Sequence, residues 1–193
     1  MSDKILGTLT REELVGKLQQ ILPQKRFEHV LRVEDMAIRL SNCHNADIIK
    51  CRTAALYHDF AKAFSLEKSL AILQKYDWEY DEQESRSGNL IHSKVAAAIA
   101  KNEYRINDEE TLLAISYHTT GRADMSLIEK IVFVADAIEE GRDYPGVSEL
   151  REKAFENLNF AMLNILNSSI LYLIKKEEEI HINTVLARNN LLR

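Results

Sequence analysis

Six side chains that can bind metal ions lie in or beside segments that otherwise read as apolar helix. They are His29, His58, Asp59, His92, His118 and Asp136. A histidine or carboxylate buried alone is costly, so each must be hydrogen-bonded, neutralised or bound to a metal ion. Their entry into predicted helical core therefore indicates a shared ligand, and one or two metal ions are the simplest choice.

Helical spacing of apolar residues runs through most of the chain. Residues 10–13 (TREE) and 126–129 (SLIE) read as capping boxes that begin helices. We expect helices over about 11–22, 24–42, 47–61, 65–76, 90–104, 108–118, 126–140, 148–178 and 183–192, with a polar loop over 77–89 and a turn at 142–146. No alternating apolar pattern typical of strands appears, so the sequence predicts an all-α fold.

A chain of 193 residues most simply forms one domain. Hydrophobic residues make up 46% of the chain and charged residues 28%, which is ordinary for a globular protein. This length can bury a full core without disulfides. We therefore expect a single domain over 1–193, with its core over about 24–142 and C-terminal helices over about 148–193 packed on that core.

The sequence disfavours several classes of protein. The net charge of −5 argues against a general nucleic-acid binder, which is normally basic. The N-terminus has no long apolar run and so no signal peptide. The best candidate for a membrane span, residues 160–174, contains polar residues and is too short. Cys43 and Cys51 do not have the spacing of a metal-binding pair. We expect a cytoplasmic protein with reduced cysteines.

The donor atoms of the six side chains indicate which metals to expect. Imidazole and carboxylate without thiolate suit iron, manganese, cobalt or catalytic zinc, whereas calcium and magnesium prefer oxygen ligands alone. Six protein ligands exceed what one catalytic ion needs if it keeps open positions. Two ions that share a bridging carboxylate are the natural count, and such a pair can clamp the attacking and leaving oxygens of a phosphoryl transfer.

Taken one at a time, these residues have simpler interpretations. The adjacent pair His58 and Asp59 is weak evidence by itself, because a chance match is plausible. A single helical histidine is more often a core residue bonded to a backbone carbonyl, and His44 is interpreted as a surface residue near a helix end. Asp136 is harder to explain in this way, because it lies inside an apolar run and a buried aspartate needs a strong partner.

Basic and polar side chains lie close in sequence to several candidate ligands: Arg26, Lys62, Thr119, Thr120, Arg122 and Arg142. Lys62 follows Asp59 by three positions and His58 by four, so we expect it to project from the same helix face. A solvated surface position is the usual alternative for each. For Lys62 and Arg142, the shared proximity to candidate ligands places a phosphate-binding role level with that alternative.

Nine segments of the chain form a recognisable pattern: residues 26–30, 54–62 (AALYHDFAK), 91–93, 114–122 (AISYHTTGR), 125–131, 134–136, 139–146, 180–184 and 188–189. Through these segments the chain resembles, over nearly its whole length, the bacterial YqeK group of HD-domain metal-dependent phosphohydrolases. Residues 114–122 and their continuation are far more specific than the His58–Asp59 pair. One departure is Ile182, where a proline is common in the family.

The resemblance implies a helical HD-domain bundle with a di-iron centre, and symmetrical hydrolysis of diadenosine tetraphosphate to two ADP. It implies that one iron is held by His29, His58 and Asp136 and the other by His92 and His118, with Asp59 as the bridge. It also implies phosphate contacts from Arg26, Lys62, Thr119 and Arg142, and nucleoside contacts from residues near His181. Asp59, Lys62 and Arg142 are expected to take part in catalysis.

Three other functions stay open at this point. Another HD phosphohydrolase, acting on a nucleoside monophosphate, a deoxynucleotide or an alarmone, would use the same metal chemistry. A nucleotide-sensing module could keep the metal but turn over slowly, although the complete ligand set favours an enzyme. A purely structural metal bundle is disfavoured by the basic residues beside the ligands. The expected partner is a small nucleotide, with no nucleic acid and no membrane, and a homodimer is left open.

Overall fold

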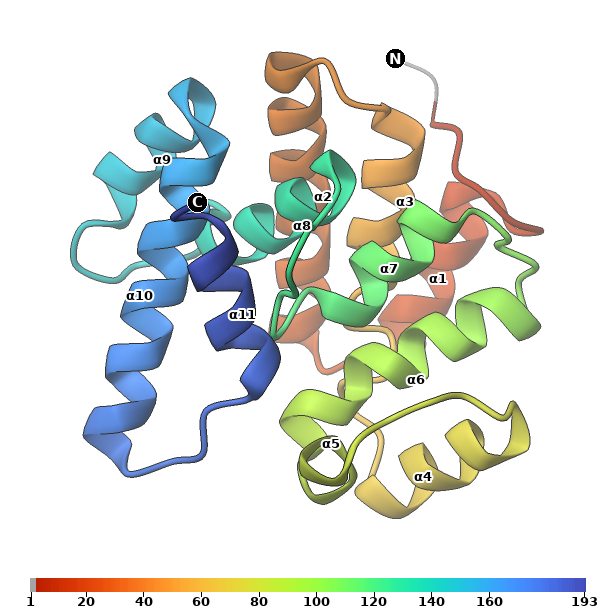
Figure 1. Ribbon diagram of the computed structural model, residues 1–193. Coiled ribbons are helices and arrows are strands. Elements are labelled where there is room, and N and C mark those ends of the chain that lie inside the picture. The colour runs from red at the N-terminus through yellow and green to blue at the C-terminus, as the bar shows by residue number, and fades with distance from the viewer. Residues whose placement is uncertain (1–2) are drawn as a thin grey trace.

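The computed structural model describes residues 3–193, which fold into eleven helices (Figure 1). These are α1 (Arg11–Ile21), α2 (Gln24–His44), α3 (Ile48–Tyr57), α4 (Leu66–Lys75), α5 (Glu82–Arg86), α6 (Gly88–Asn102), α7 (Glu109–Tyr117), α8 (Leu127–Ile138), α9 (Val147–Glu156), α10 (Leu158–Lys176) and α11 (Ile182–Asn190). No strand occurs within residues 3–193. The predicted all-α fold is therefore confirmed.

The core is formed by helices that are far apart in sequence. α2 packs against α3 and α8, α7 packs against α6 and α8, and α3 also contacts α6, α7 and α8. Residues 91–100 of α6 are buried without interruption, and α8 is buried along most of its length. Full burial of one large aliphatic side chain contributes about 1.5–3 kcal/mol. This packing fixes the helices that carry the candidate ligands.

Two smaller groups of helices cover the core (Figure 1). α9, α10 and α11 lie together, with α10 in contact with α8, α9 and α11. α4 and α5 cover α6 at the opposite side. The core group and the α10 group meet along α8, and the candidate site lies beside this contact.

Both capping boxes occur as the sequence predicts. At the start of α1, the Thr10 side chain accepts a hydrogen bond from the Glu13 amide, and the Glu13 carboxylate accepts one from the Thr10 amide. Ser126 and Glu129 make the same exchange at the start of α8. Each exchange satisfies two amides that a helix leaves without partners in its first turn.

Three expected elements differ in the structure. The helix expected over 47–61 ends at Tyr57, and the amides of Phe60, Lys62 and Phe64 donate to carbonyls three residues earlier, in a series of tight turns. The loop expected over 77–89 contains the short helix α5, which begins with a capping box from Asp81 to Glu84. That Asp-x-x-Glu pattern was a usable signal in the sequence.

The third difference is a break in the long helix expected over 148–178. Asn157 has extended backbone angles (φ −149°, ψ 98°), and its side chain accepts a hydrogen bond from the Phe160 amide. Asparagine competes with the helix for backbone hydrogen bonds and favours helix starts. The segment therefore forms α9 and α10 instead of one helix.

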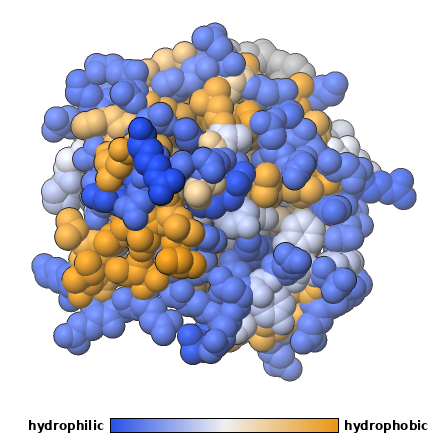
Figure 2. Space-filling view, viewed as in Figure 1, coloured by the Kyte–Doolittle hydropathy of each residue, from blue (hydrophilic) through white to orange (hydrophobic). Residues whose placement is uncertain are grey.

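α10 is longer than the apolar segment expected over 160–174. α10 has 19 residues, and by length and composition alone it is long and apolar enough to cross a membrane. The expectation that this apolar segment is too short to span is therefore wrong. Core helices can pass the same test, but only 28% of its apolar window is buried. Figure 2 shows an apolar area where α10 and α11 lie, and the exposed side chains there include Leu171, Tyr172 and Ile174.

Candidate metal centre

The fold brings all six predicted ligands together in one cluster. His29 comes from α2, His92 from α6 and Asp136 from α8, while His58, Asp59 and His118 follow directly after the ends of α3 and α7. The four histidines and Asp59 are buried, and Asp136 is half-buried. Three overlapping groups of three ligands each keep their donor atoms within 4.8 Å of one another: His29, His58 and Asp59; His58, His118 and Asp136; and Asp59, His92 and His118.

Asp59 lies between two pairs of histidines. Its Oδ2 lies 3.4 Å from His58 Nε2 and 3.8 Å from His29 Nε2. Its Oδ1 lies 3.1 Å from His92 Nε2 and 3.9 Å from His118 Nε2. Each carboxylate oxygen therefore faces a different pair, which is the arrangement that a carboxylate bridging two ions requires.

Three of the four rings are oriented by a hydrogen bond at Nδ1. The Nδ1 of His58 donates to the Ala55 carbonyl at 2.6 Å, and that of His118 donates to the Ile115 carbonyl at 2.9 Å. The Nδ1 of His29 lies 3.1 Å from Glu139 Oε1. Metal-binding histidines usually donate their second ring nitrogen in this way, which fixes the tautomer and turns the free Nε2 toward the ion.

The buried ring nitrogens fit a metal ion better than they fit protein partners. The Nε2 atoms of His29 and His58 are buried and make no well-aligned hydrogen bond within residues 3–193, although His29 Nε2 lies 3.0 Å from Asp136 Oδ1, another predicted ligand. The Nε2 atoms of His92 and His118 lie only 3.1 Å apart. Buried nitrogens without a partner are costly. Their donor set of imidazole and carboxylate suits iron, manganese, cobalt or zinc.

Burial and mutual charge set the pKa values in this cluster. Burial lowers the pKa of His92, and it lowers the pKa of His118 to about 3. Burial would also lower the pKa of His58, but the neighbouring Asp59 carboxylate outweighs it and raises the pKa. Burial opposes the charge of Asp59, and the adjacent histidines nevertheless hold its pKa well below the ordinary value. Because metal ligands must be deprotonated, metal binding here competes with protons.

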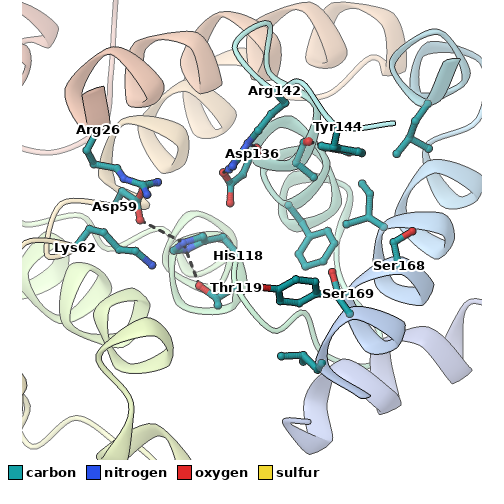
Figure 3. A pocket seen from close by; sticks show the side chains of 16 residues that line it. Arg26, Asp59, Lys62, His118, Thr119, Asp136, Arg142, Tyr144, Ser168 and Ser169 are labelled. Atoms are coloured by element: carbon teal, nitrogen blue, oxygen red, sulfur yellow. Dashed lines mark hydrogen bonds and ion pairs between the residues drawn. The ribbon is translucent and has the colours of Figure 1, made fainter. Parts of the chain in front are cut away.

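The predicted basic residues Arg26, Lys62 and Arg142 line a cavity of about 580 Å³ that Asp59, His118 and Asp136 also line (Figure 3). Arg26 pairs with Asp59 Oδ2 at 2.8 Å, and Arg142 pairs with Asp136 Oδ1 at 2.7 Å. Lys62 makes no hydrogen bond or ion pair within the described part of the chain, and burial lowers its pKa. It reaches the cavity from the turn after α3, so the expectation that it shares a helix face with Asp59 is wrong.

Thr119 also lines this cavity, and its Oγ1 lies 3.2 Å from His118 Nε2. His181 does not line it. The His181 ring is buried. Its Nε2 lies 2.7 Å from Asp81 Oδ2, and its Nδ1 accepts a hydrogen bond from the Asn183 amide at the start of α11, so both ring nitrogens have protein partners. A nucleoside contact near His181 stays a prediction.

Glu139 is a site residue that the sequence reasoning missed. Its buried carboxylate accepts hydrogen bonds from His29 Nδ1, from Arg32 Nε at 2.6 Å and from the Gly141 amide at 2.5 Å. The signal was present, because Glu139 lies three residues after Asp136 at the end of an apolar helix. In the sequence, residues 139–140 stand out only as part of the segment that carries the family resemblance, and nothing there pairs Glu139 with His29.

An all-helical protein with a buried cluster of histidines and carboxylates, and with basic residues at its mouth, has the features of a metal-dependent hydrolase. Residues 26–141 match the family described as HD domain. This match covers more than half of the chain, so the chain belongs to the HD-domain family.

Known proteins are similar along most of the chain. The symmetrical bis(5'-nucleosyl)-tetraphosphatase of Staphylococcus aureus is 40% identical over 85% of this chain and 85% of its own length. The protein of the same name from Halalkalibacterium halodurans is 37% identical over 92% of this chain and 96% of its own. A crystal structure from Clostridium acetobutylicum is described as a predicted HD superfamily hydrolase involved in NAD metabolism. It has a TM-score of 0.92 at 40% identity and covers 96% of this chain and 98% of its own. The chain is thus a hydrolase of the YqeK group within the HD-domain family.

Proposed function

We propose that this protein hydrolyses diadenosine tetraphosphate, and similar dinucleoside polyphosphates, symmetrically to two ADP at a di-iron centre. The observation that carries the proposal is the position of Asp59, with one oxygen toward His29 and His58 and the other toward His92 and His118. The names of the relatives at 37% and 40% identity support the substrate.

In this proposal His29, His58 and Asp136 would hold one ion and His92 and His118 the other, and Asp59 would be the ligand common to both. Iron is the expected metal, with manganese, cobalt or zinc as substitutes. Such ions would supply Lewis-acid charge and an activated water near neutral pH. The protein itself orients the rings through the Nδ1 contacts of His29, His58 and His118.

The side chains at the mouth of the cavity have separate tasks in this proposal. Lys62, which has no partner among residues 3–193, would donate to a non-bridging phosphate oxygen, where charge builds up during phosphoryl transfer. Arg142 has a planar fork that suits bidentate phosphate binding. Arg26 and Thr119 line the same cavity and would contact neighbouring phosphates. Arg26 and Arg142 would have to share or leave their carboxylate partners to do so.

The proposal also covers partners and location. The expected partner is the small nucleotide substrate, and we expect no nucleic-acid or membrane partner. We expect the protein to act in the cytoplasm, and a homodimer is left open. A rival HD phosphohydrolase would act on a different nucleotide with the same ligands. The description of the Clostridium acetobutylicum protein makes NAD a specific rival to test.

The test is an assay of anaerobically iron-loaded protein with a panel of dinucleoside polyphosphates, NAD and mononucleotides, with products separated by chromatography. We expect ADP as the sole product of diadenosine tetraphosphate. ATP together with AMP would show asymmetric attack and would reject the proposal. Comparable turnover of mononucleotides or of NAD would support the rival instead.

A further inference from the structure

The helix α8, which carries Asp136, ends without a left-handed cap. A helix leaves its last four carbonyls without amide partners, and a residue in the left-handed conformation commonly follows to satisfy them. The residue after α8 is Glu139, whose backbone angles (φ −53°, ψ 158°) lie outside that conformation. Side chains from elsewhere therefore have to hold the carbonyls at this end of α8.

Arg151, from α9, holds the chain where it leaves α8. Its Nε donates to the Ile138 carbonyl at 2.8 Å. Its Nη2 donates to the Glu139 carbonyl at 3.1 Å and to the Arg142 carbonyl at 3.4 Å. The Arg151 side chain is only 15% exposed, and its ion pair with Glu140 is longer, at 3.7 Å. The planar guanidinium, whose donors form a fixed fork, thus serves three carbonyls at once.

Two of these carbonyls mark the ends of a tight turn over residues 139–142. The Arg142 amide donates to the Glu139 carbonyl at 2.9 Å, which closes the turn. From this turn the Arg142 side chain reaches back to Asp136, where its Nε donates to the carbonyl at 2.9 Å and its Nη2 donates to Oδ1 at 2.7 Å. Figure 3 shows Arg142 beside Asp136 at the cavity of the metal cluster. The direction of the Arg142 side chain therefore depends on the turn that Arg151 holds.

Arg151 itself does not line that cavity, although its neighbour Leu150 does. We propose that Arg151 is a positioning residue for the reaction, because its fork fixes the turn over 139–142 and so directs Arg142 toward a substrate phosphate. The inference rests on the proposed function, in which Arg142 binds that phosphate. A displacement of about 1 Å in a group that binds substrate can cost about 10²-fold in rate, even when the changed residue lies away from the chemistry. Loss of the fork should therefore act through Arg142.

A double-mutant cycle between Arg151 and Arg142 tests this route. Arg151→Met keeps the apolar stem of the side chain and removes the fork. In the natural protein we expect it to lower kcat/KM for diadenosine tetraphosphate by about 10- to 100-fold. In the Arg142→Ala background the same change should matter by no more than about twofold, because the side chain that Arg151 positions is gone. Lys153→Met is the matched control and should leave both backgrounds unchanged, since Lys153 lies in α9, is 45% exposed and pairs with Glu156 at 2.8 Å.

A merely structural role for Arg151 predicts the same loss in both backgrounds, and equal losses would overturn the inference. Loss of metal from Arg151→Met in elemental analysis would also overturn it, since the effect would then not pass through Arg142. Unchanged turnover in Arg142→Ala would reject the phosphate contact of Arg142, and the inference with it.

Titration calorimetry of the metal-loaded protein with ADP gives the same cycle without turnover. Arg151→Met should weaken ADP binding about three- to tenfold in the natural protein and by no more than about twofold in Arg142→Ala. Equal weakening in both backgrounds would overturn the inference. This measurement decides it even if the natural protein does not hydrolyse the dinucleotide, a result that would reject the proposed function instead.

Arg151→Lys serves if Arg151→Met does not fold. Lysine keeps the charge without the planar fork, so this variant should lower kcat/KM by about three- to tenfold, and the loss should again vanish in the Arg142→Ala background. Full activity in Arg151→Lys would overturn the inference, because the fork would then not be needed.

Discussion

Glu139 should control metal affinity although it binds no metal itself. Its carboxylate lies 3.1 Å from His29 Nδ1 and is held in turn by Arg32 and by the Gly141 amide. Glu139→Ala removes the acceptor that orients the His29 ring. Glu139→Gln keeps an acceptor of the same size but loses the negative charge that makes the imidazole a stronger ligand.

The magnitude follows from the role of such partners. Loss of a hydrogen-bond partner behind a metal-binding histidine typically weakens metal binding about 10- to 100-fold, which is about 1.4–2.7 kcal/mol. Glu139→Ala should lie at the upper end and Glu139→Gln at the lower end. Arg32 loses its closest partner in Glu139→Ala, but it keeps Glu28 at 3.9 Å, and its side chain is 37% exposed, so water can replace the lost contact.

The assay is a titration of metal-free protein with cobalt(II), followed by absorption and calibrated with a competing chelator. Glu140→Gln is the matched control, because Glu140 is the next residue, is half-exposed and pairs with Arg39 at 2.6 Å, away from the ligands. Cobalt affinity in Glu139→Ala equal to that of Glu140→Gln would refute the argument that the Nδ1 contact fixes His29 for the metal.

Three further outcomes are expected. Asp59→Ala should lose both metal ions together in elemental analysis, and full retention of metal would exclude a bridging role. Lys62→Ala and Arg142→Ala should each keep the metal and lower the rate by about 10²–10³-fold. Unchanged turnover in either variant would show that its residue does not contact the substrate phosphates. Because the folded pKa values of His92 and His118 lie below the unfolded value of about 6.5, their stabilising effect is complete above that pH and is lost as pH falls toward the folded values. His58, whose pKa is raised in the metal-free fold, must lose its proton before it can bind metal, so metal binding weakens as pH falls through that pKa. The difference in melting temperature between metal-loaded and metal-free protein should therefore shrink from about pH 8 to about pH 5, and a constant difference would contradict the site.

Much of the site could be predicted because its members are chemically costly where they stand. A single buried histidine such as His92 in α6 has a simple explanation, but several histidines and carboxylates in predicted core helices together require strong partners. The helix starts at Thr10 and Ser126 were also predictable, since capping boxes are local patterns. Features that depend on one short stretch of chain, or on the cost of burial alone, can be read from the sequence.

Features that depend on tertiary contacts could not be predicted from the sequence. The role of Glu139 requires knowing that the end of α8 returns to α2, 110 positions away in sequence. The break at Asn157 depends on a single side chain that outweighs the helical pattern on either side of it. A cavity of about 610 Å³ beside that of the metal cluster is lined by residues of α5, α6, α8, α10 and α11 and by Thr119 and Thr120 after α7, and no single segment of the sequence contains it.

The ends of α3 and α7 explain how residues from two helices can serve one metal centre. His58 and Asp59 directly follow Tyr57, the last residue of α3, and Asp59 Oδ2 lies 3.4 Å from His58 Nε2. His118 likewise follows the last residue of α7. The C-terminal ends of both helices therefore meet at the cluster, where their partial negative charge favours bound cations. The sequence alone conceals the end of α3, because the apolar pattern continues through Phe60 and Ala61.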